Sequence, residues 1–102
     1  MPRLIALYNN PADPDGFDAH YRDVHTPIIQ RYPNLRQLRL SRPKGVAGQP
    51  VPYHLMAEMT FATDTELDEA LGSDAGRESA KDLRNFAQAG VTLFVAPDEA
   101  DA

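Results

Sequence analysis

The stretch that decides the fold of this chain is YHLMAEMTF, residues 53–61. Its odd-numbered positions hold Tyr, Leu, Ala, Met and Phe, whereas its even-numbered positions hold His, Met, Glu and Thr. Successive side chains of a strand point to opposite faces, so this period of two predicts a β-strand with one face in the core. The other face, which carries His54, Met56 and Glu58, is expected to meet solvent or a partner.

Three further segments have the composition of strands. Residues 4–8 form an apolar run closed by two Asn and a Pro, and residues 91–96 are rich in β-branched and aromatic side chains. Between residues 35 and 42 the side chains alternate, which places Arg39 on a wet or interfacial face. Residues 43–52 contain two Gly and three Pro and are predicted to form a mobile loop.

Two segments follow helical spacing. The first is predicted over residues 15–24, and Thr26-Pro27 then indicates a kinked or restarted turn up to residue 31. The second begins with a capping-box pattern at Thr63, breaks at Gly72-Ser73 and has Gly90 placed to end it. The apolar stripe expected on its second half consists of Ala80, Leu83, Phe86 and Ala87.

The resulting order, β-α-β-β-α-β, predicts one α+β domain over residues 1–102, with a frayed tail at residues 97–102. Two helices are too few to connect four parallel strands, whereas a four-stranded antiparallel sheet with both helices on one face uses every element. This is the ferredoxin-like arrangement. The sheet face without helices would expose apolar side chains to water, which is unfavourable, so the chain is expected to form a homodimer through this face. The expected interface residues are Arg39, His54, Met56 and Glu58.

The composition excludes several classes of protein. The chain has 102 residues and a formal net charge of −5, and nucleic acid is disfavoured as a partner because phosphate binding needs clustered basic residues. It contains no cysteine, which excludes disulfides, thiolate catalysis and Cys-based metal centres. The apolar run near the N-terminus is too short for a signal peptide or a membrane span, so a cytoplasmic location without a membrane partner is expected.

Three histidines, His20, His25 and His54, are the main candidates for proton-transfer chemistry. On an ideal helix His20 and His25 lie roughly 70° on either side of the apolar stripe, so periodicity ranks them equally. His25 also precedes Thr26-Pro27, where the helix is interrupted, and interrupted helices leave backbone groups unpaired and allow pockets to open. The alternative is that His25 is a border residue that only hydrogen-bonds the structure.

No metal or cofactor motif is present. His20 and His25 are five residues apart rather than three or four, and His54 and Glu58 would lie about 13 Å apart along a strand, so no metal site is expected. The glycine-containing loop lacks the spacing of a phosphate-binding loop. If a partner subunit covers Glu58, this carboxylate needs a cation, and Arg39 is the candidate. An interface ion pair is favoured over a catalytic role for Glu58.

Several short motifs in this order and spacing resemble the EthD family over residues 4–95. They are Leu7-Tyr8 followed by Pro11, Phe17…Tyr21…His25-Thr26-Pro27-Ile28, Pro33-Asn34-Leu35, the strand at residues 53–61, and Asn85-Phe86-Ala87…Gly90-Val91-Thr92. The most specific are the Tyr-x-x-x-His-x-Pro segment and the Glu-x-x-Phe strand.

This resemblance implies a dimeric α+β barrel, in agreement with the packing argument. EthD-like proteins are named after an ether-degradation operon served by a cytochrome P450 system. The wider superfamily includes methylmuconolactone isomerases, polyketide cyclases and cofactor-free monooxygenases, whose pockets lie between the sheet and the helices of each subunit. By this likeness His25 is the pocket acid/base with Tyr21 beside it, and no cofactor is expected.

The first functional hypothesis is an enzyme or catabolic accessory of isomerase, cyclase or cofactor-free oxygenase type that acts on a hydrophobic carbonyl- or lactone-bearing compound. His25 would move a proton, because imidazole titrates near neutral pH, with Tyr21 as its neighbour. Tyr8, Tyr53 and Phe86 are the expected substrate-binding residues. The alternative is a non-catalytic dimeric module for an apolar metabolite, which the shortage of nucleophiles and cofactor motifs favours. A purely structural dimer is the third possibility.

Overall fold

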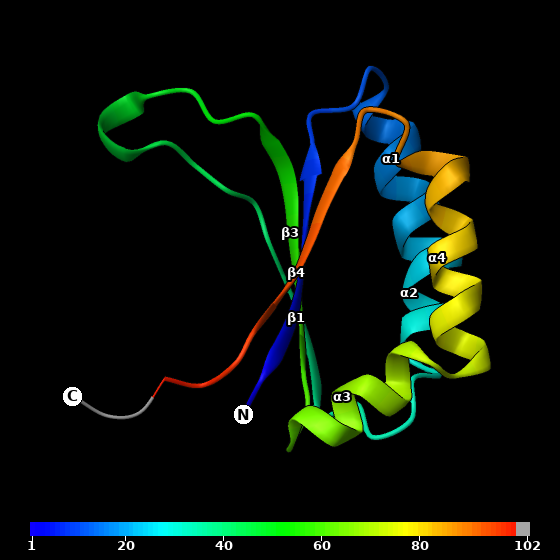
Figure 1. Cartoon of the computed structure of the whole chain (residues 1–102). Coiled ribbons are helices and arrows are strands. Elements are labelled where there is room, and N and C mark those ends of the chain that lie inside the picture. The colour runs from blue at the N-terminus through cyan, green and yellow to red at the C-terminus, as the bar shows by residue number, and fades with distance from the viewer. Residues whose placement is uncertain (100–102) are drawn as a thin grey trace.

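The computed structural model describes residues 1–99 and shows a four-stranded sheet with helices on one face (Figure 1). The strands are β1 (Arg3–Asn9), β2 (Gln37–Ser41), β3 (Tyr53–Thr60) and β4 (Val91–Ala96). The helical elements are α1 (Pro14–His20), the π-helical turn η1 (Tyr21–His25), α2 (Thr26–Ile29), the 3₁₀ turn η2 (Val46–Gly48), α3 (Asp64–Leu71) and α4 (Asp74–Phe86). The frayed tail stays a prediction, because residues 100–102 lie outside the described range.

The strand order across the sheet is β2-β3-β1-β4, and every pairing is antiparallel. β1 and β3 are the inner strands, so Ala6 of β1 lies between Ala57 of β3 and Leu93 of β4. The chain forms two β-α-β units, and the helical segment of each unit packs against the same face of the sheet (Figure 1). The predicted ferredoxin-like fold is therefore confirmed.

The core fills the space between the sheet and the helices. In β3 the alternation read from the sequence holds, because Leu55, Ala57 and Met59 are buried whereas Met56 and Glu58 are only partly covered. Removing such apolar surface from water is the main favourable term in folding. Aromatic side chains from four elements meet at the centre of this core; they are Tyr8, Phe17, Tyr21 and Phe86.

The first helical segment is continuous but changes its winding at η1. Here the backbone N–H of Thr26 bonds the carbonyl of Tyr21, five residues back rather than four. Pro27, the next residue, has no N–H to donate and so cannot continue the regular hydrogen-bond ladder. The interruption predicted at Thr26-Pro27 is present, but it takes the form of a π turn inside one unbroken helical segment.

The ends of α3 and α4 follow the sequence pattern with one exception. Thr63 and Ser73 each accept a hydrogen bond from the backbone N–H three residues further on, at 3.1 Å in both cases. Helix α4 ends at Phe86, earlier than expected. Gly90, with a φ of 109°, instead forms the turn that leads into β4.

The buried stripe of α4 differs from the predicted one. Ala80 is exposed and Leu83 is only partly buried. The residues that face the core are Ala75, Gly76, Ser79, Asp82 and Phe86. The prediction holds for Phe86, which is buried, and for Leu83 and Ala87, which pack against the core. It fails for the exposed Ala80, and it missed the two buried polar residues, Ser79 and Asp82, which are held by hydrogen bonds.

The sheet face opposite the helices carries Ile5, Leu7 and Met56 together with a charged pair. Nη1 of Arg3 donates a hydrogen bond to Oε1 of Glu58 at 2.9 Å. Arg39 lies directly opposite Glu58 in the β2–β3 register, but within residues 1–99 it forms no ion pair with this carboxylate. In the single chain the cation that accompanies Glu58 is therefore Arg3 of β1, and an Arg39–Glu58 pair under a partner subunit stays a prediction.

His54 does not lie on this open face. The β1–β3 register shifts between Tyr8 and Asn9, which leaves His54 as the extra residue of a β-bulge and turns its side chain toward α1. Its ring packs edge-on against Phe17 at 5.1 Å between centroids, and its Nε2 lies 2.8 Å from Oδ1 of Asp18. The placement of His54 with Met56 and Glu58 was wrong, because strict alternation takes no account of a bulge.

The loop predicted at residues 43–52 connects β2 to β3 and contains η2. It projects away from the helical layer, on the side of the open sheet face (Figure 1). None of the helices within residues 1–99 combines the length and the apolar composition that a membrane crossing needs.

Candidate active site

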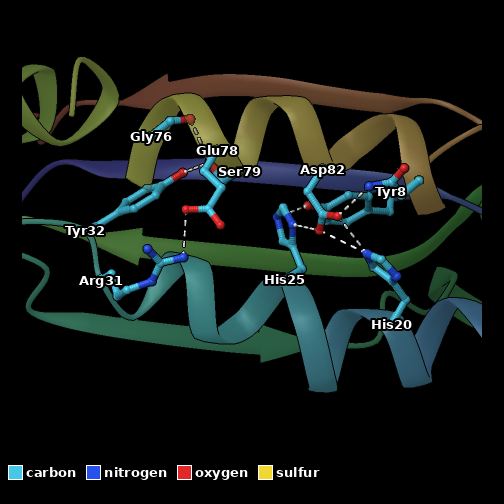
Figure 2. A network of polar contacts seen from close by, with 10 residues as sticks. Tyr8, His20, His25, Arg31, Tyr32, Gly76, Glu78, Ser79 and Asp82 are labelled. Atoms are coloured by element: carbon cyan, nitrogen blue, oxygen red, sulfur yellow. Dashed lines mark hydrogen bonds and ion pairs between the residues drawn. The ribbon is translucent and has the colours of Figure 1, made fainter. Parts of the chain in front are cut away.

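Two histidines of the first helical segment converge on one buried carboxylate of α4 (Figure 2). Nδ1 of His25 lies 2.9 Å from Oδ2 of Asp82. Nε2 of His20 lies 2.8 Å from Oδ1 and 3.0 Å from Oδ2 of the same residue. Asn85 donates a further hydrogen bond to Oδ1 at 3.0 Å. The carboxylate is thus surrounded by three nitrogen partners.

The π turn explains why His20 and His25 reach the same carboxylate. Residues five apart on a regular α-helix point about 140° away from each other. A π turn joins residues i and i+5 by a backbone hydrogen bond, so residues five apart approach the same face of the helix. The spacing that argues against a shared partner on an α-helix therefore permits one here.

His25 separates this carboxylate from a small cavity between the sheet and the helices. Its Nε2, on the side of the ring away from Asp82, lies 3.5 Å from the hydroxyl oxygen of Tyr8. The cavity has a volume of about 80 Å³, and its polar lining comes from Tyr8, His25, Tyr32 and Ser79. The remaining lining residues are Leu4, Ala6, Ile29, Met59, Leu71, Gly76, Ala80, Leu83 and Leu93.

The cavity reaches the surface at three of its apolar lining residues. Leu71, Ala80 and Leu93 are exposed, although each contributes to the wall. Pockets for small organic ligands generally exceed about 300 Å³, so a ligand larger than a few atoms requires this side to widen. These three side chains belong to α3, α4 and β4.

Aromatic rings enclose His25 on the side away from the cavity. The centroid of its ring lies 5.2 Å from that of Tyr21 and 4.7 Å from that of Phe86. The Tyr21 hydroxyl is buried and has no hydrogen-bond partner within residues 1–99. Neither Tyr21 nor Phe86 lines the cavity, whereas Tyr8 does. Tyr53 is half-buried at the start of β3 and lies outside both the cavity and the aromatic cluster.

Burial and hydrogen bonding set the protonation states of the site. Burial lowers the pKa of His25 below its usual value, although the nearby carboxylate acts in the opposite direction. Burial disfavours ionisation of Asp82, but hydrogen bonds from Asn85 and the two histidines outweigh it and hold the pKa of this carboxyl below its usual range. Burial raises the pKa of Tyr8 and of Tyr21, so both phenols stay protonated at neutral pH.

These protonation states assign a role to each nitrogen of His25. An ionised carboxylate only accepts hydrogen bonds, so the neutral imidazole carries its proton on Nδ1 and donates it to Asp82. Nε2 is then unprotonated, and it faces the cavity and the Tyr8 hydroxyl, from which it accepts a long hydrogen bond at 3.5 Å. An imidazole oriented by a carboxylate in this way is the arrangement of a general base.

A second, larger hollow lies on the other side of Asp82. It is an open cleft of about 580 Å³, and His20, Asn85, Phe17 and Phe86 line it together with residues of the β1–α1 and α4–β4 connections. His20 stacks on Phe86 at 5.0 Å between ring centroids. The histidine–carboxylate network therefore lies between the small cavity and the open cleft.

A second polar pair helps to build the cavity wall. Ser79 donates its hydroxyl proton to the carbonyl of Gly76 at 2.9 Å, and so accepts a short hydrogen bond from the Tyr32 hydroxyl (Figure 2). Next to it, an exposed ion pair joins Arg31 to Glu78 at 2.8 Å. Both pairs connect the end of the first helical segment to α4, which carries Asp82.

The structure brings together part of the predicted site and adds residues that the sequence analysis missed. Tyr8, Tyr21 and Phe86 meet His25, but Tyr53 does not. Asp82 and Ser79 were missed, although their spacing with Ala75 and Phe86 places all four on one face of α4. Within residues 1–99 no group of three or more His, Asp or Glu side chains is arranged to hold a metal ion.

Comparison with known proteins identifies relatives of the whole chain. Residues 9–90 match the EthD domain family. An uncharacterized 11.0 kDa protein from the thcB-thcC intergenic region of Rhodococcus erythropolis is 33% identical over 97% of this chain and 96% of its own length. The crystal structure of an EthD family protein from Bacillus halodurans is 34% identical, with a TM-score of 0.89 over 97% of this chain and 99% of that one.

A more distant structure shares the fold alone. The cofactor-independent oxygenase SnoaB from Streptomyces nogalater superposes with a TM-score of 0.71 over 98% of this chain and 94% of its own, at 12% identity.

Proposed function

The chain belongs to the EthD family, and from this relationship we propose that it is an enzyme acting on a small hydrophobic molecule that carries a carbonyl or lactone group. The observation that carries the proposal is the buried His25–Asp82 pair, which presents an unprotonated Nε2 to an apolar cavity beside the Tyr8 hydroxyl. Pockets with apolar walls and a few convergent polar groups are typical of small-molecule sites.

In the proposed reaction, His25 removes a proton from the carbon next to the carbonyl group. The electron pair of the C–H bond moves toward the carbonyl oxygen, which becomes an enolate, and the proton binds to Nε2 of His25. Asp82 stabilises the imidazolium that forms at its Nδ1–H. Return of the proton to another carbon completes an isomerisation, attack of the enolate on a second carbonyl completes a cyclisation, and an oxygenase would present the same enolate to dioxygen.

Tyr8 is the proposed partner of the substrate oxygen. Its pKa is raised by burial, so the hydroxyl stays protonated and can donate a hydrogen bond to a carbonyl or enolate oxygen. The hydroxyl lies 3.5 Å from Nε2 of His25, which allows both groups to act on adjacent atoms of one ligand. Tyr21 and Phe86 hold the imidazole from behind, and Tyr53 is not part of the proposed site.

A homodimer formed through the open sheet face completes the proposal. This face presents Ile5, Leu7, Met56 and Phe94 around the Arg3–Glu58 pair, and Arg39 lies opposite Glu58. Phe94 is 42% exposed, which is unfavourable for a large aromatic side chain in water. A second copy of the chain would cover these side chains and leave the cavity of each subunit on the opposite side of its sheet.

Hydrogen–deuterium exchange tests the proposed chemistry without knowledge of the product. A panel of hydrophobic ketones and lactones is incubated with the full chain in D₂O, and deuterium incorporation next to the carbonyl is followed by NMR. The wild type should accelerate exchange for the compounds that it binds, and His25→Gln should lose this acceleration by at least about 100-fold, the usual contribution of a general base. His54→Gln is the matched control, because His54 pairs with Asp18 outside the network.

Two results would contradict the proposal. One is exchange that proceeds at the wild-type rate in a folded His25→Gln variant. The other is tight binding of panel compounds without any exchange, in the wild type and in the variant alike. The second result would favour a non-catalytic binding module instead.

A further inference from the structure

The second imidazole on Asp82 has no role in the proposed proton abstraction. His20 contacts both carboxylate oxygens, whereas His25 contacts only one. The side chain of His20 is 25% exposed and faces the open cleft, whereas that of His25 is 3% exposed and faces the small cavity. One imidazole of the network is therefore much more accessible to solvent than the other.

One carboxylate cannot compensate two imidazolium ions. Asp82 carries a single negative charge, so protonation of one histidine reduces the attraction available to the second, and the two positive charges repel each other across the carboxylate. A charge on the half-exposed ring is solvated from the cleft, whereas a charge on the buried ring must give up its hydration. The first proton added to the pair is therefore expected on His20.

We propose that His20 is a positioning residue that captures the proton which acid would otherwise place on His25, and so keeps Nε2 of His25 available as a base. The significance of this role for turnover rests on the proposed function, but the competition for a proton exists without a substrate. His20 acts through Asp82 and reaches the cleft, not the cavity.

The other groups around the network do not compete for this proton. From β1 the network meets Tyr8, and within the same helical segment it meets Tyr21, and both phenols are neutral over the relevant pH range. From α4 it meets Asn85, which does not titrate. Asp13 lines the same cleft as His20, and its carboxylate accepts a hydrogen bond from the backbone N–H of Gly16.

Histidine ring NMR on the full chain tests the competition directly. In the wild type, the titration midpoint of His20 should lie above that of His25. In His20→Gln, whose amide can still donate a hydrogen bond but cannot be charged, the His25 midpoint should rise by about one pH unit, a tenfold gain in proton affinity. His54→Gln, remote from Asp82, should leave the His25 midpoint unchanged.

Two measurements would overturn the inference. One is a wild type in which His25 takes up its proton at a higher pH than His20, which requires no variant at all. The other is a folded His20→Gln protein with an unmoved His25 midpoint.

The pH profile of deuterium exchange separates this inference from the proposed function. If His20→Gln raises the His25 midpoint but neither protein catalyses exchange, the positioning role stands and the enzyme proposal fails. If both proteins catalyse exchange with the same acidic limb and the same His25 midpoint, the enzyme proposal stands and the role of His20 fails. If the enzyme proposal and the role of His20 are both right, the acidic limb of the exchange profile of His20→Gln moves to higher pH together with the His25 midpoint.

Discussion

Nδ1 of His25 lies 2.9 Å from Oδ2 of Asp82, although 57 residues separate the two in the chain. Both side chains are almost fully buried, so each depends on the other to satisfy polar atoms that water does not reach. The contact joins the π-helical turn to α4 and orients the imidazole toward the cavity. Stability, protonation and the proposed chemistry therefore depend on the same pair.

Substitution of Asp82 by Asn should impair the proposed base while keeping the size of the side chain. Without the negative charge, the pKa of His25 falls further and the imidazolium loses its stabilising partner. We expect deuterium exchange to fall by about 100-fold or more, and the His25 midpoint to move to lower pH. Asp23→Asn, which changes an exposed carboxylate of η1, is the control and should alter neither value. A fully active D82N protein would show that the carboxylate does not assist His25.

The pH dependence of stability follows from the same groups. The pKa of His25 is lower in the folded chain than its ordinary value of 6.5, so the unfolded chain binds this proton first as the pH falls. The free energy of unfolding should therefore decrease below pH 6.5, until the folded-state pKa is reached. Asp82 affects stability in the same direction, because folding also lowers its pKa. Its contribution to the free energy of unfolding is lost as the pH falls below the ordinary value of 3.8.

Urea unfolding at about pH 7.5 and about pH 5.5 measures this effect of His25. The wild type should lose more stability between the two conditions than His25→Gln does. Equal losses in both proteins would mean that folding does not perturb the titration of His25.

The proposed homodimer can be disrupted by one charge on the open sheet face. Met56→Glu should repel the partner subunit and place a second carboxylate near Glu58, because buried like charges are strongly unfavourable at an interface. Sedimentation should find the wild type at twice its 11.3 kDa mass and the variant at 11.3 kDa. Val24→Glu, at a 42% exposed site on the helical layer, should remain dimeric. A wild type that sediments as a monomer would refute the dimer.

Two glycines at the α3–α4 junction should respond differently to the same substitution. A Cβ on Gly76 would lie 2.4 Å from the carbonyl oxygen of Ala70 and 2.5 Å from that of Leu71, whereas a Cβ on Gly72 would lie 3.6 Å from its nearest neighbour. Gly76→Ala should destabilise the chain by about 1–3 kcal/mol through overpacking at the cavity wall. Gly72→Ala should be neutral or stabilising by about 0.4–1 kcal/mol. Urea unfolding measures the free energy of unfolding of both variants. Similar changes in the two variants would argue against close packing around Gly76.

The fold was predictable because it depends on repeated local signals. The alternation at residues 53–61 identified β3 and its buried face, and Thr63 and Ser73 marked the starts of α3 and α4 as the structure has them. His25 was singled out by a local signal as well, since Thr26-Pro27 interrupts hydrogen bonding in the preceding turn. Patterns of this kind involve neighbours in the chain, whose geometry is constrained by the backbone itself.

The partners of His25 were decided by the tertiary structure. Helical periodicity ranked His20 and His25 as equals, and the sequence left Asp82 unnoticed, because a hydrogen bond across 57 residues has no local pattern. The same holds for His54, which a β-bulge turned toward α1, and for Glu58, whose contact with Arg3 crosses 55 residues of the chain. Which polar groups meet in a core depends on how strands and helices pack, and packing is a property of the whole chain rather than of any segment.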